Sequence, residues 1–301
     1  MKSFIEINNK NMEVLQIGKD GIPILILTGM ACSFEEWIEI TQILSRNDRV
    51  IMYHRPGLGA SEIGAEKRTT AQSCEEIICL LESLNVTEPI LLIAHSYGGL
   101  IAQHFAKLHP RKVRALVLVD STSEDLEKLD ELHLPILNNN ATDEDWINAC
   151  KNYAEMTEKD LETVLQTTLT EAQKRLPHHI QQSLIEFQHK PNLYKAMKSE
   201  VENWKEDARI VKELGHLNRL PLRIIGRDKS AMIKLGIMDG LPEEELTILE
   251  EVWEKLIKDQ VLLSSDNKLI FAENAGHAVY LDRPELIIET VKEVKKSLSL
   301  L

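Results

Sequence analysis

Apolar runs of strand length alternate with segments of helical periodicity along the first third of the chain. Residues 4–8 and 12–17 predict a hairpin, because Asn-Lys-Asn turn residues separate them. A continuous apolar run at 23–28 predicts a strand buried on both faces, and further strands are predicted at 49–53, 90–94 and 113–119. Helical spacing of apolar residues predicts helices between these strands, at 33–44, 69–84 and 97–108. This alternation of strand and helix indicates a doubly wound, mostly parallel sheet with helices on both faces.

The periodicity changes after Asp120. Residues 123–215 show no convincing strand and have the polar, amphipathic pattern of several helices. Helix-start signals support this interpretation, since Thr142 and Thr157 are each followed by acidic residues. An earlier start signal is Ser33, the expected N-cap of the helix at 33–44, with Glu36 completing a capping box.

Strand patterns return beyond this helical segment. Further strands are predicted at 221–226 and 268–272, and further helices at about 242–258 and 284–298. The expected architecture is an eight-stranded α/β core of residues 1–122 and 216–301. A helical cap of residues 123–215 is inserted after the sixth strand.

Composition and charge narrow the classes of partner. The 48 acidic residues exceed the 35 Lys and Arg, which gives a net charge of −13 and no basic stripe for nucleic acid or anionic lipid. The sequence has neither an apolar run long enough to span a membrane nor a signal-peptide pattern at its start. We therefore expect a cytoplasmic protein that binds neither nucleic acid nor membranes.

The sequence also lacks the patterns of common cofactor sites. Its four cysteines show no C-x-x-C or Cys/His spacing, which favours reduced thiols and no structural metal. Gly57 and Gly59 lack the third glycine of a dinucleotide-binding loop. We expect neither a metal nor a cofactor.

The segment from Leu91 to Gly99, L-L-I-A-H-S-Y-G-G, carries the candidate chemistry. It follows a buried strand and opens a helix, so Ser96 lies on a sharp turn that exposes its hydroxyl. Such a turn is crowded and needs small residues two positions before and after the serine, which Ala94 and Gly98 supply. A glycine-rich packing turn is the structural alternative, but the strand–turn–helix context favours a nucleophile.

The loop Leu27-Thr28-Gly29-Met30, after the first buried strand, is the second element. In this architecture it aims a backbone N–H at a developing oxyanion, and the N–H after the nucleophile is its partner. The candidate donors are the amides of Met30 and Tyr97.

A base is needed because a neutral hydroxyl is a poor nucleophile at neutral pH. Ten histidines occur, and His277 is distinguished by its place on a loop after the final strand, next to a glycine. We interpret His95 and His104, which flank the nucleophile in sequence, as packing residues.

Together these segments resemble the α/β-hydrolase superfamily over nearly the whole chain outside the cap. The resemblance rests on the small-x-Ser-x-Gly turn, the T-G-M loop, the segment H-R-P-G-L-G-A-S (54–61) and the terminal G-H. Segment 54–61 is similar to the superfamily's D-x-x-G-x-G-x-S loop, with His54 or Arg55 where an acid is common. The cap makes the chain similar to the capped branch, which contains esterases, lactonases and C–C hydrolases.

The resemblance leaves two candidates for the acid of a triad. Many relatives carry it after the seventh strand within G-x-x-D, whereas residues 226–229 read G-R-D-K and place Asp228 one position early. Other members carry it after the sixth strand, where Asp120 stands. Either carboxylate can hold His277 in the right tautomer and stabilise its charged form. We favour Asp120 because it needs no register adjustment.

The resemblance implies a serine hydrolase that cleaves an ester, amide or lactone-type acyl bond of a small molecule through an acyl-enzyme. Its expected state is monomer or homodimer. Dehalogenases and epoxide hydrolases of this fold carry Asp at the elbow, so Ser96 argues against both. A cofactor-free lyase or oxygenase of the same fold is one alternative. A ligand-binding signalling protein with little turnover is the other.

Overall fold

Eight strands form one sheet. The computed structural model describes residues 2–139 and 142–298. The strands are β1 (Lys2–Ile7), β2 (Lys10–Ile17), β3 (Pro23–Leu27), β4 (Arg49–Tyr53), β5 (Ile90–His95), β6 (Val113–Val119), β7 (Leu222–Gly226) and β8 (Asn267–Phe271). Their order is β1-β2-β4-β3-β5-β6-β7-β8, antiparallel from β1 to β4 and parallel from β4 to β8. The predicted eight-stranded, mostly parallel α/β sheet is confirmed.

The central strands are apolar throughout because helices cover both faces of the sheet. In β3, Ile24 and Ile26 face one apolar cluster, and Leu25 and Leu27 face the other. One face is covered by α1 (Ile38–Leu44) and α11 (Pro284–Leu298). The other is covered by α2 (Thr70–Ser83), α3 (Tyr97–Leu108) and α9 (Glu243–Asp259). Short helical segments complete the core: η1 (Phe34–Trp37), η2 (Pro110–Lys112), α8 (Lys229–Met238), η5 (Gln260–Leu263) and α10 (Val279–Asp282).

Only helices occur between β6 and β7 in the described part of the chain. They are η3 (Leu126–Leu129), α4 (Asp143–Ala154), α5 (Glu158–Leu165), η4 (Gln173–Arg175), α6 (His178–Gln188) and α7 (Pro191–Glu213). Helices α4 and α5 start at the predicted N-caps Thr142 and Thr157, and both residues also form capping boxes. Residues 140 and 141 of the predicted cap lie outside the described residues.

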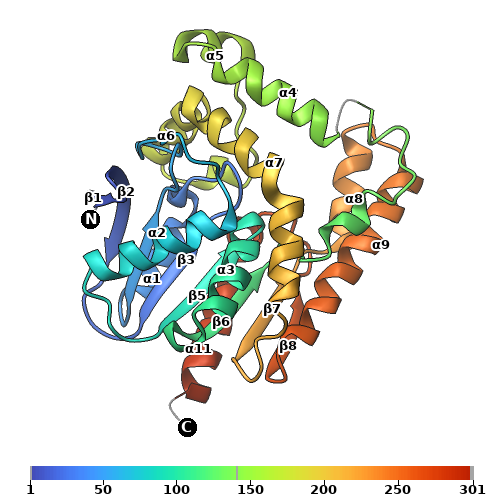
Figure 1. Cartoon of the computed structure of the whole chain (residues 1–301). Coiled ribbons are helices and arrows are strands. Elements are labelled where there is room, and N and C mark those ends of the chain that lie inside the picture. Colours follow the sequence, from blue (N-terminus) through green and yellow to red (C-terminus); the bar gives the residue numbers. More distant parts are fainter. Residues whose placement is uncertain (1, 140–141, 299–301) are drawn as a thin grey trace.

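The inserted helices gather at one end of the sheet, and α7 connects them to the core. In Figure 1, α4, α5 and α6 lie away from the chain's C-terminus, and α7 runs down from them beside α3. Ala208 and Val211, near the end of α7, belong to the same apolar cluster as α2 and α3. The division of the chain at residues 123 and 215 stays a prediction.

Three local predictions need correction. The hairpin turn is formed by Asn8 and Asn9, whose φ angles are 51° and 59°, and Lys10 already belongs to β2. Ser33 caps a short 3₁₀ segment, η1, before α1 begins at Ile38. The Glu36 carboxylate does not complete a capping box, because its oxygens bind Gln173 and Tyr280 instead. Helix α8 was not predicted at all.

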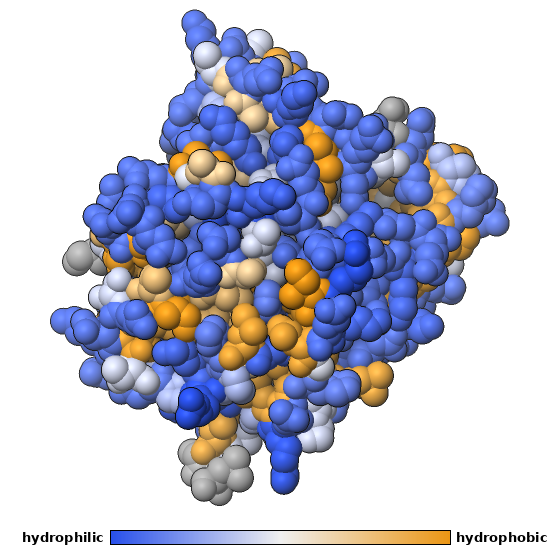
Figure 2. All heavy atoms as spheres, in the orientation of Figure 1, coloured by the Kyte–Doolittle hydropathy of each residue, from blue (hydrophilic) through white to orange (hydrophobic). Residues whose placement is uncertain are grey.

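One face of the molecule is shown with its side chains in Figure 2. Figure 2 shows a mostly hydrophilic face on which hydrophobic side chains appear in separate groups. Within residues 2–139 and 142–298, no helix is both long enough and apolar enough to cross a membrane. All four cysteines are free thiols.

Candidate active site

Ser96 lies in the turn between β5 and α3. Its φ of 52° and ψ of −127° put a residue with a side chain in a strained backbone conformation. Ala94 is fully buried, and a Cβ added to Gly98 would lie only 2.5 Å from the carbonyl oxygen of Thr28. The structure therefore has the strand–turn–helix geometry that exposes a serine hydroxyl at the edge of a sheet.

His277 lies on the loop between β8 and α10. Its side chain is 39% exposed, and its Nδ1 is 2.5 Å from Oδ2 of Asp120. The backbone oxygen of His277 accepts a hydrogen bond from Nε2 of His95 at 2.9 Å. His95 thus holds the His277 loop against the end of β5, and burial lowers the pKa of His95 to about 3.

Asp120 follows β6 and is fully buried. Its Oδ1 accepts a hydrogen bond from Nε1 of Trp253 at 2.9 Å, and its Oδ2 lies 3.3 Å from the guanidinium of Arg227. Burial alone raises the pKa of this carboxyl group. The hydrogen bond and charge of His277, with the charge of Arg227, outweigh burial and hold the pKa at about 2. An ionised carboxylate at Nδ1 fixes the tautomer of the ring and stabilises its protonated form.

Asp228, the other candidate acid, has a different task. Its Oδ1 accepts hydrogen bonds from the N–H groups of Ser230 and Ala231, so it is the N-cap of α8. Its Oδ2 accepts from the N–H of Asn274 at 2.9 Å, on the loop that leads to His277. The structure brings Asp120 to His277 and directs Asp228 to the backbone.

The two candidate oxyanion donors are the N–H of Met30, on the loop after β3, and the N–H of Tyr97, the residue after Ser96. Neither the N–H of Met30 nor that of Tyr97 has a hydrogen-bond acceptor among the described residues. A Cβ added to Gly29 would lie 3.1 Å from Cβ of Ser96, so the loop after β3 packs directly on the nucleophile turn. Free backbone donors beside a nucleophile form the arrangement that stabilises a tetrahedral oxyanion.

Arg55 supports this loop and was not identified from sequence as a site residue. It is 1% exposed, and its guanidinium donates to the carbonyl oxygens of Thr28 at 2.8 Å and Gly29 at 3.1 Å. The same guanidinium binds both carboxylate oxygens of Glu200, on α7, at 2.8 and 3.2 Å. One side chain therefore fixes the loop after β3 (27–30), the candidate oxyanion loop, and ties it to an inserted helix.

The remaining histidines near the site are structural. His54 stands where relatives commonly have an acid. Its Nδ1 is 2.8 Å from Oε2 of Glu13 and its Nε2 accepts from the N–H of Phe34. Nδ1 of His104 is 2.8 Å from the hydroxyl of Thr70.

Three cavities involve the candidate site or residues that neighbour it. A small one of about 90 Å³ is lined by Ser96, by Ser121, Thr122 and Ser123 after β6, and by apolar side chains of η3, α7 and α9. It shares Leu126, Leu129 and Trp204 with a cavity of about 810 Å³ between η3, α4, α7, α8 and α9. The third, of about 460 Å³, lies between the segment after Met30 and the inserted helices. In the described ranges, no three His, Cys, Asp or Glu residues cluster as metal ligands.

Known proteins share both sequence and fold with this chain. A family model described as "alpha/beta hydrolase fold" matches residues 22–203. A protein of Gibberella zeae described as an AB hydrolase superfamily protein is 26% identical over 291 residues, covering 90% of this chain and 85% of its own length. The soluble epoxide hydrolase of Corynebacterium sp. is 29% identical over 133 residues, covering 43% of this chain and 45% of its own length.

A solved structure extends the similarity in fold to almost all of the chain. A probable hydrolytic enzyme from Pseudomonas aeruginosa PAO1 has a TM-score of 0.68 at 21% identity, covering 98% of this chain and 93% of its own. The order of the strands, the turn at Ser96 and the family match all indicate the α/β-hydrolase fold. Hydrolysis is the class of reaction that these relatives support, and the chain belongs to the α/β-hydrolase fold family.

Proposed function

We propose that this protein is a serine hydrolase that cleaves carboxylic esters of small molecules, with Ser96, His277 and Asp120 as its triad. The observation that carries the proposal is the short Nδ1–Oδ2 contact between His277 and the buried, ionised Asp120. That contact leaves Nε2 of His277 to accept a proton, on a loop that His95 holds against the end of β5, directly before Ser96.

The chemistry follows from these groups. Oγ of Ser96 attacks the ester carbonyl carbon while Nε2 of His277 takes the hydroxyl proton. The N–H groups of Met30 and Tyr97 stabilise the negative charge on the carbonyl oxygen. His277 then protonates the departing alkoxide, which leaves as the alcohol. A water molecule, deprotonated by His277, attacks the acyl-enzyme in the same way and releases the carboxylic acid and free Ser96.

A serine nucleophile suits acyl compounds better than epoxides, the substrates named for one relative. Opening an epoxide with Ser96 would form an ether, which has no carbonyl group for water to attack. An acyl-serine ester has that carbonyl and turns over. The cavity of about 90 Å³ beside Ser96 favours short, apolar acyl groups.

The direct test uses nitrophenyl esters of graded acyl length. We expect hydrolysis to fall steeply as the acyl chain outgrows the small cavity. Ser96→Ala and His277→Ala should each reduce the rate by several orders of magnitude, as loss of a triad member does elsewhere. Ser96→Ala should also abolish labelling by a fluorophosphonate. Undiminished labelling of a folded Ser96→Ala protein would show that another residue is the nucleophile. No turnover and no labelling of the wild-type protein would favour the ligand-binding alternative.

A further inference from the structure

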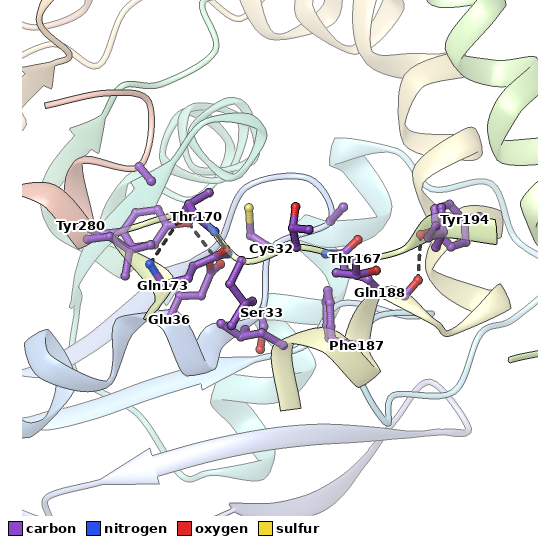
Figure 3. Close-up of a pocket in the computed structure, with 17 residues that line it drawn as sticks. Cys32, Ser33, Glu36, Thr167, Thr170, Gln173, Phe187, Gln188, Tyr194 and Tyr280 are labelled. Carbon is purple, nitrogen blue, oxygen red and sulfur yellow. Dashed lines mark hydrogen bonds between the residues drawn. The ribbon is translucent and has the colours of Figure 1, made fainter. Parts of the chain in front are cut away.

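The cavity of about 460 Å³ has walls from two parts of the fold. Ala31, Cys32 and Ser33 form one side, directly after the oxyanion-loop residue Met30. The inserted segment from Leu165 to Gln173 and residues of α6 form the other (Figure 3). Ala278, which directly follows His277 in the chain, also lines it.

Glu36 is the one charged residue among the side chains that line this cavity. It is 6% exposed, and no Lys, Arg or His lines the cavity with it. Its carboxylate accepts hydrogen bonds from Nε2 of Gln173 at 2.7 Å and from the hydroxyl of Tyr280 at 3.2 Å (Figure 3). Both donors are neutral, so they orient the carboxylate without balancing its charge. A buried carboxylate without a counter-ion is costly unless a ligand supplies the positive charge.

The other walls also suit a cation. The aromatic side chains of Tyr280, which stacks on Trp37, and Phe187 also line the cavity, and aromatic side chains attract positive charge. The hydroxyl oxygens of Thr167 and Thr170 can accept hydrogen bonds from an ammonium group. The cavity therefore combines one buried carboxyl group, aromatic side chains and neutral acceptors.

We infer that this cavity binds an alkylammonium group on the alcohol part of the ester, with Glu36 as its counter-ion. This inference rests on the proposed function and adds a substrate class to it. The alcohol part is assigned here because Ala278 follows the histidine that protonates the departing group. The acyl part is assigned to the small apolar cavity beside Ser96.

The pKa of Glu36 links binding of a cation in this cavity to pH. Burial raises its pKa, and the hydrogen bonds from Gln173 and Tyr280 offset this only in part. A bound ammonium would favour ionisation, so its affinity should increase with pH until the free carboxyl group is ionised.

The charged groups of the neighbouring elements are occupied elsewhere. Glu35 pairs with Lys2, and the guanidinium of Arg175, on η4, donates to the backbone oxygen of Leu281 and lies 3.9 Å from Asp282. Cys32, whose thiol keeps its proton because burial raises its pKa to about 12, adds no charge.

A pair of matched thioesters tests the inference. S-[2-(dimethylamino)ethyl] thioacetate is protonated at neutral pH, and S-(3-methylbutyl) thioacetate has nearly the same shape without the charge. Thiol release is measured for both compounds. We expect kcat/KM of the wild-type protein to favour the cationic thioester about tenfold or more, the range for hydrogen bonds to charged groups. Glu36→Gln keeps the size of the side chain and removes its charge; the amide oxygen can still accept from Nε2 of Gln173, and the NH2 group can donate to the hydroxyl oxygen of Tyr280. This substitution should remove the preference while leaving turnover of the neutral thioester within about threefold.

Glu35→Gln is the matched control, because it makes the same change of charge one residue away and should keep the preference. Binding is measured separately by calorimetry in Ser96→Ala, with 2-dimethylaminoethanol and its neutral isostere 3-methylbutan-1-ol. If the amine binds preferentially and Glu36→Gln abolishes this preference, the cavity assignment is supported, whether or not the thioesters are cleaved. Failure of the wild-type protein to cleave either thioester would reject the hydrolase proposal and not the cavity assignment. The inference would be overturned if the two alcohols bound equally well. It would also be overturned if a folded Ser96→Ala/Glu36→Gln protein still bound the amine more tightly than the neutral alcohol. The role of Glu36 would then be to hold the inserted segment through Gln173.

Discussion

Oδ2 of Asp120 and Nδ1 of His277 lie 2.5 Å apart, although 157 positions separate the two residues in the chain. The contact is possible because β6 and β8 end at the same edge of the sheet, and the loops after parallel strands meet there. Asp120 is rigid in this place, since Trp253 and Arg227 hold its two oxygens from other directions.

Asp120→Asn should therefore nearly abolish turnover of a short ester. An amide cannot stabilise imidazolium and can impose the wrong tautomer on the ring, losses that amount to about 10⁴ in rate in a well-studied triad. Asp228→Asn should have a small effect, because its task is to cap α8. The check is kcat of both variants on one substrate, with melting curves to show that both are folded. A collapse in Asp228→Asn alone would assign the triad acid to Asp228.

Gly29→Ala should lower kcat more than it changes KM. The added Cβ would lie 2.9 Å from Nδ1 of His95 and 3.1 Å from Cβ of Ser96, and we expect the loop to shift because His95 is buried and bound to the backbone of His277. Moving the loop displaces the N–H of Met30, and loss of one oxyanion donor elsewhere lowers kcat about 10²- to 10³-fold. Steady-state kinetics on a nitrophenyl ester gives kcat and KM of the variant separately. An unchanged kcat would show that Met30 is not an oxyanion donor.

Much of the site was predictable because its residues follow strands in a fixed chain order. Ser96 directly follows β5, and Met30 and His277 lie on the loops that follow β3 and β8. Asp120 was favoured for the same reason. Asp228 followed a strand too, but Asp before a run of helix-forming residues is an N-cap signal. Applying that signal would also have predicted α8.

The contacts that span the fold could not be predicted. Arg55 and Glu200 are 145 positions apart, and neither belongs to a periodic pattern that indicates a partner. Glu36 matched a local capping pattern, but Gln173 and Tyr280, 137 and 244 positions away, bind its carboxylate instead. A capping box brings only a modest gain in stability, so tertiary partners can redirect the side chain.

Arg55→Lys should reduce kcat because one ammonium cannot reproduce the planar fork that reaches Thr28, Gly29 and Glu200 together. The matched control is Arg68→Lys. Arg68 is a buried arginine paired with the buried Glu76, and no hydrogen bond joins it to the oxyanion loop. We expect both variants to melt at a lower temperature and only Arg55→Lys to lose activity in the folded state. Equal losses of kcat would mean that Arg55 acts through overall stability alone.

Asp207 provides a prediction for stability against pH. This residue of α7 is buried, and its Oδ2 accepts a hydrogen bond from the N–H of Thr70 at the start of α2. Burial raises its pKa from 3.8 to about 6, and the bonds from Thr70 offset that only in part. The folded state thus binds the proton more tightly than the unfolded state does. Between the unfolded-state pKa of 3.8 and the folded-state pKa of about 6, the free energy of unfolding falls as pH rises. Above the folded-state pKa, the stabilisation by the bound proton is lost completely.

Asp207→Asn removes this titration but keeps an oxygen that can accept from the N–H of Thr70. Relative to this variant, the wild-type protein should become more stable as pH falls from 8 to 4. The difference should be about 3 kcal/mol at most, which follows from the pKa change at about 1.4 kcal/mol for each pH unit. Urea unfolding of both proteins at each pH gives the difference directly and cancels the titration of all other groups. Parallel stability curves across this range would show that Asp207 ionises normally in the folded protein. A difference that grows in the opposite direction would mean that its carboxylate is stabilised by the start of α2 more than burial penalises it.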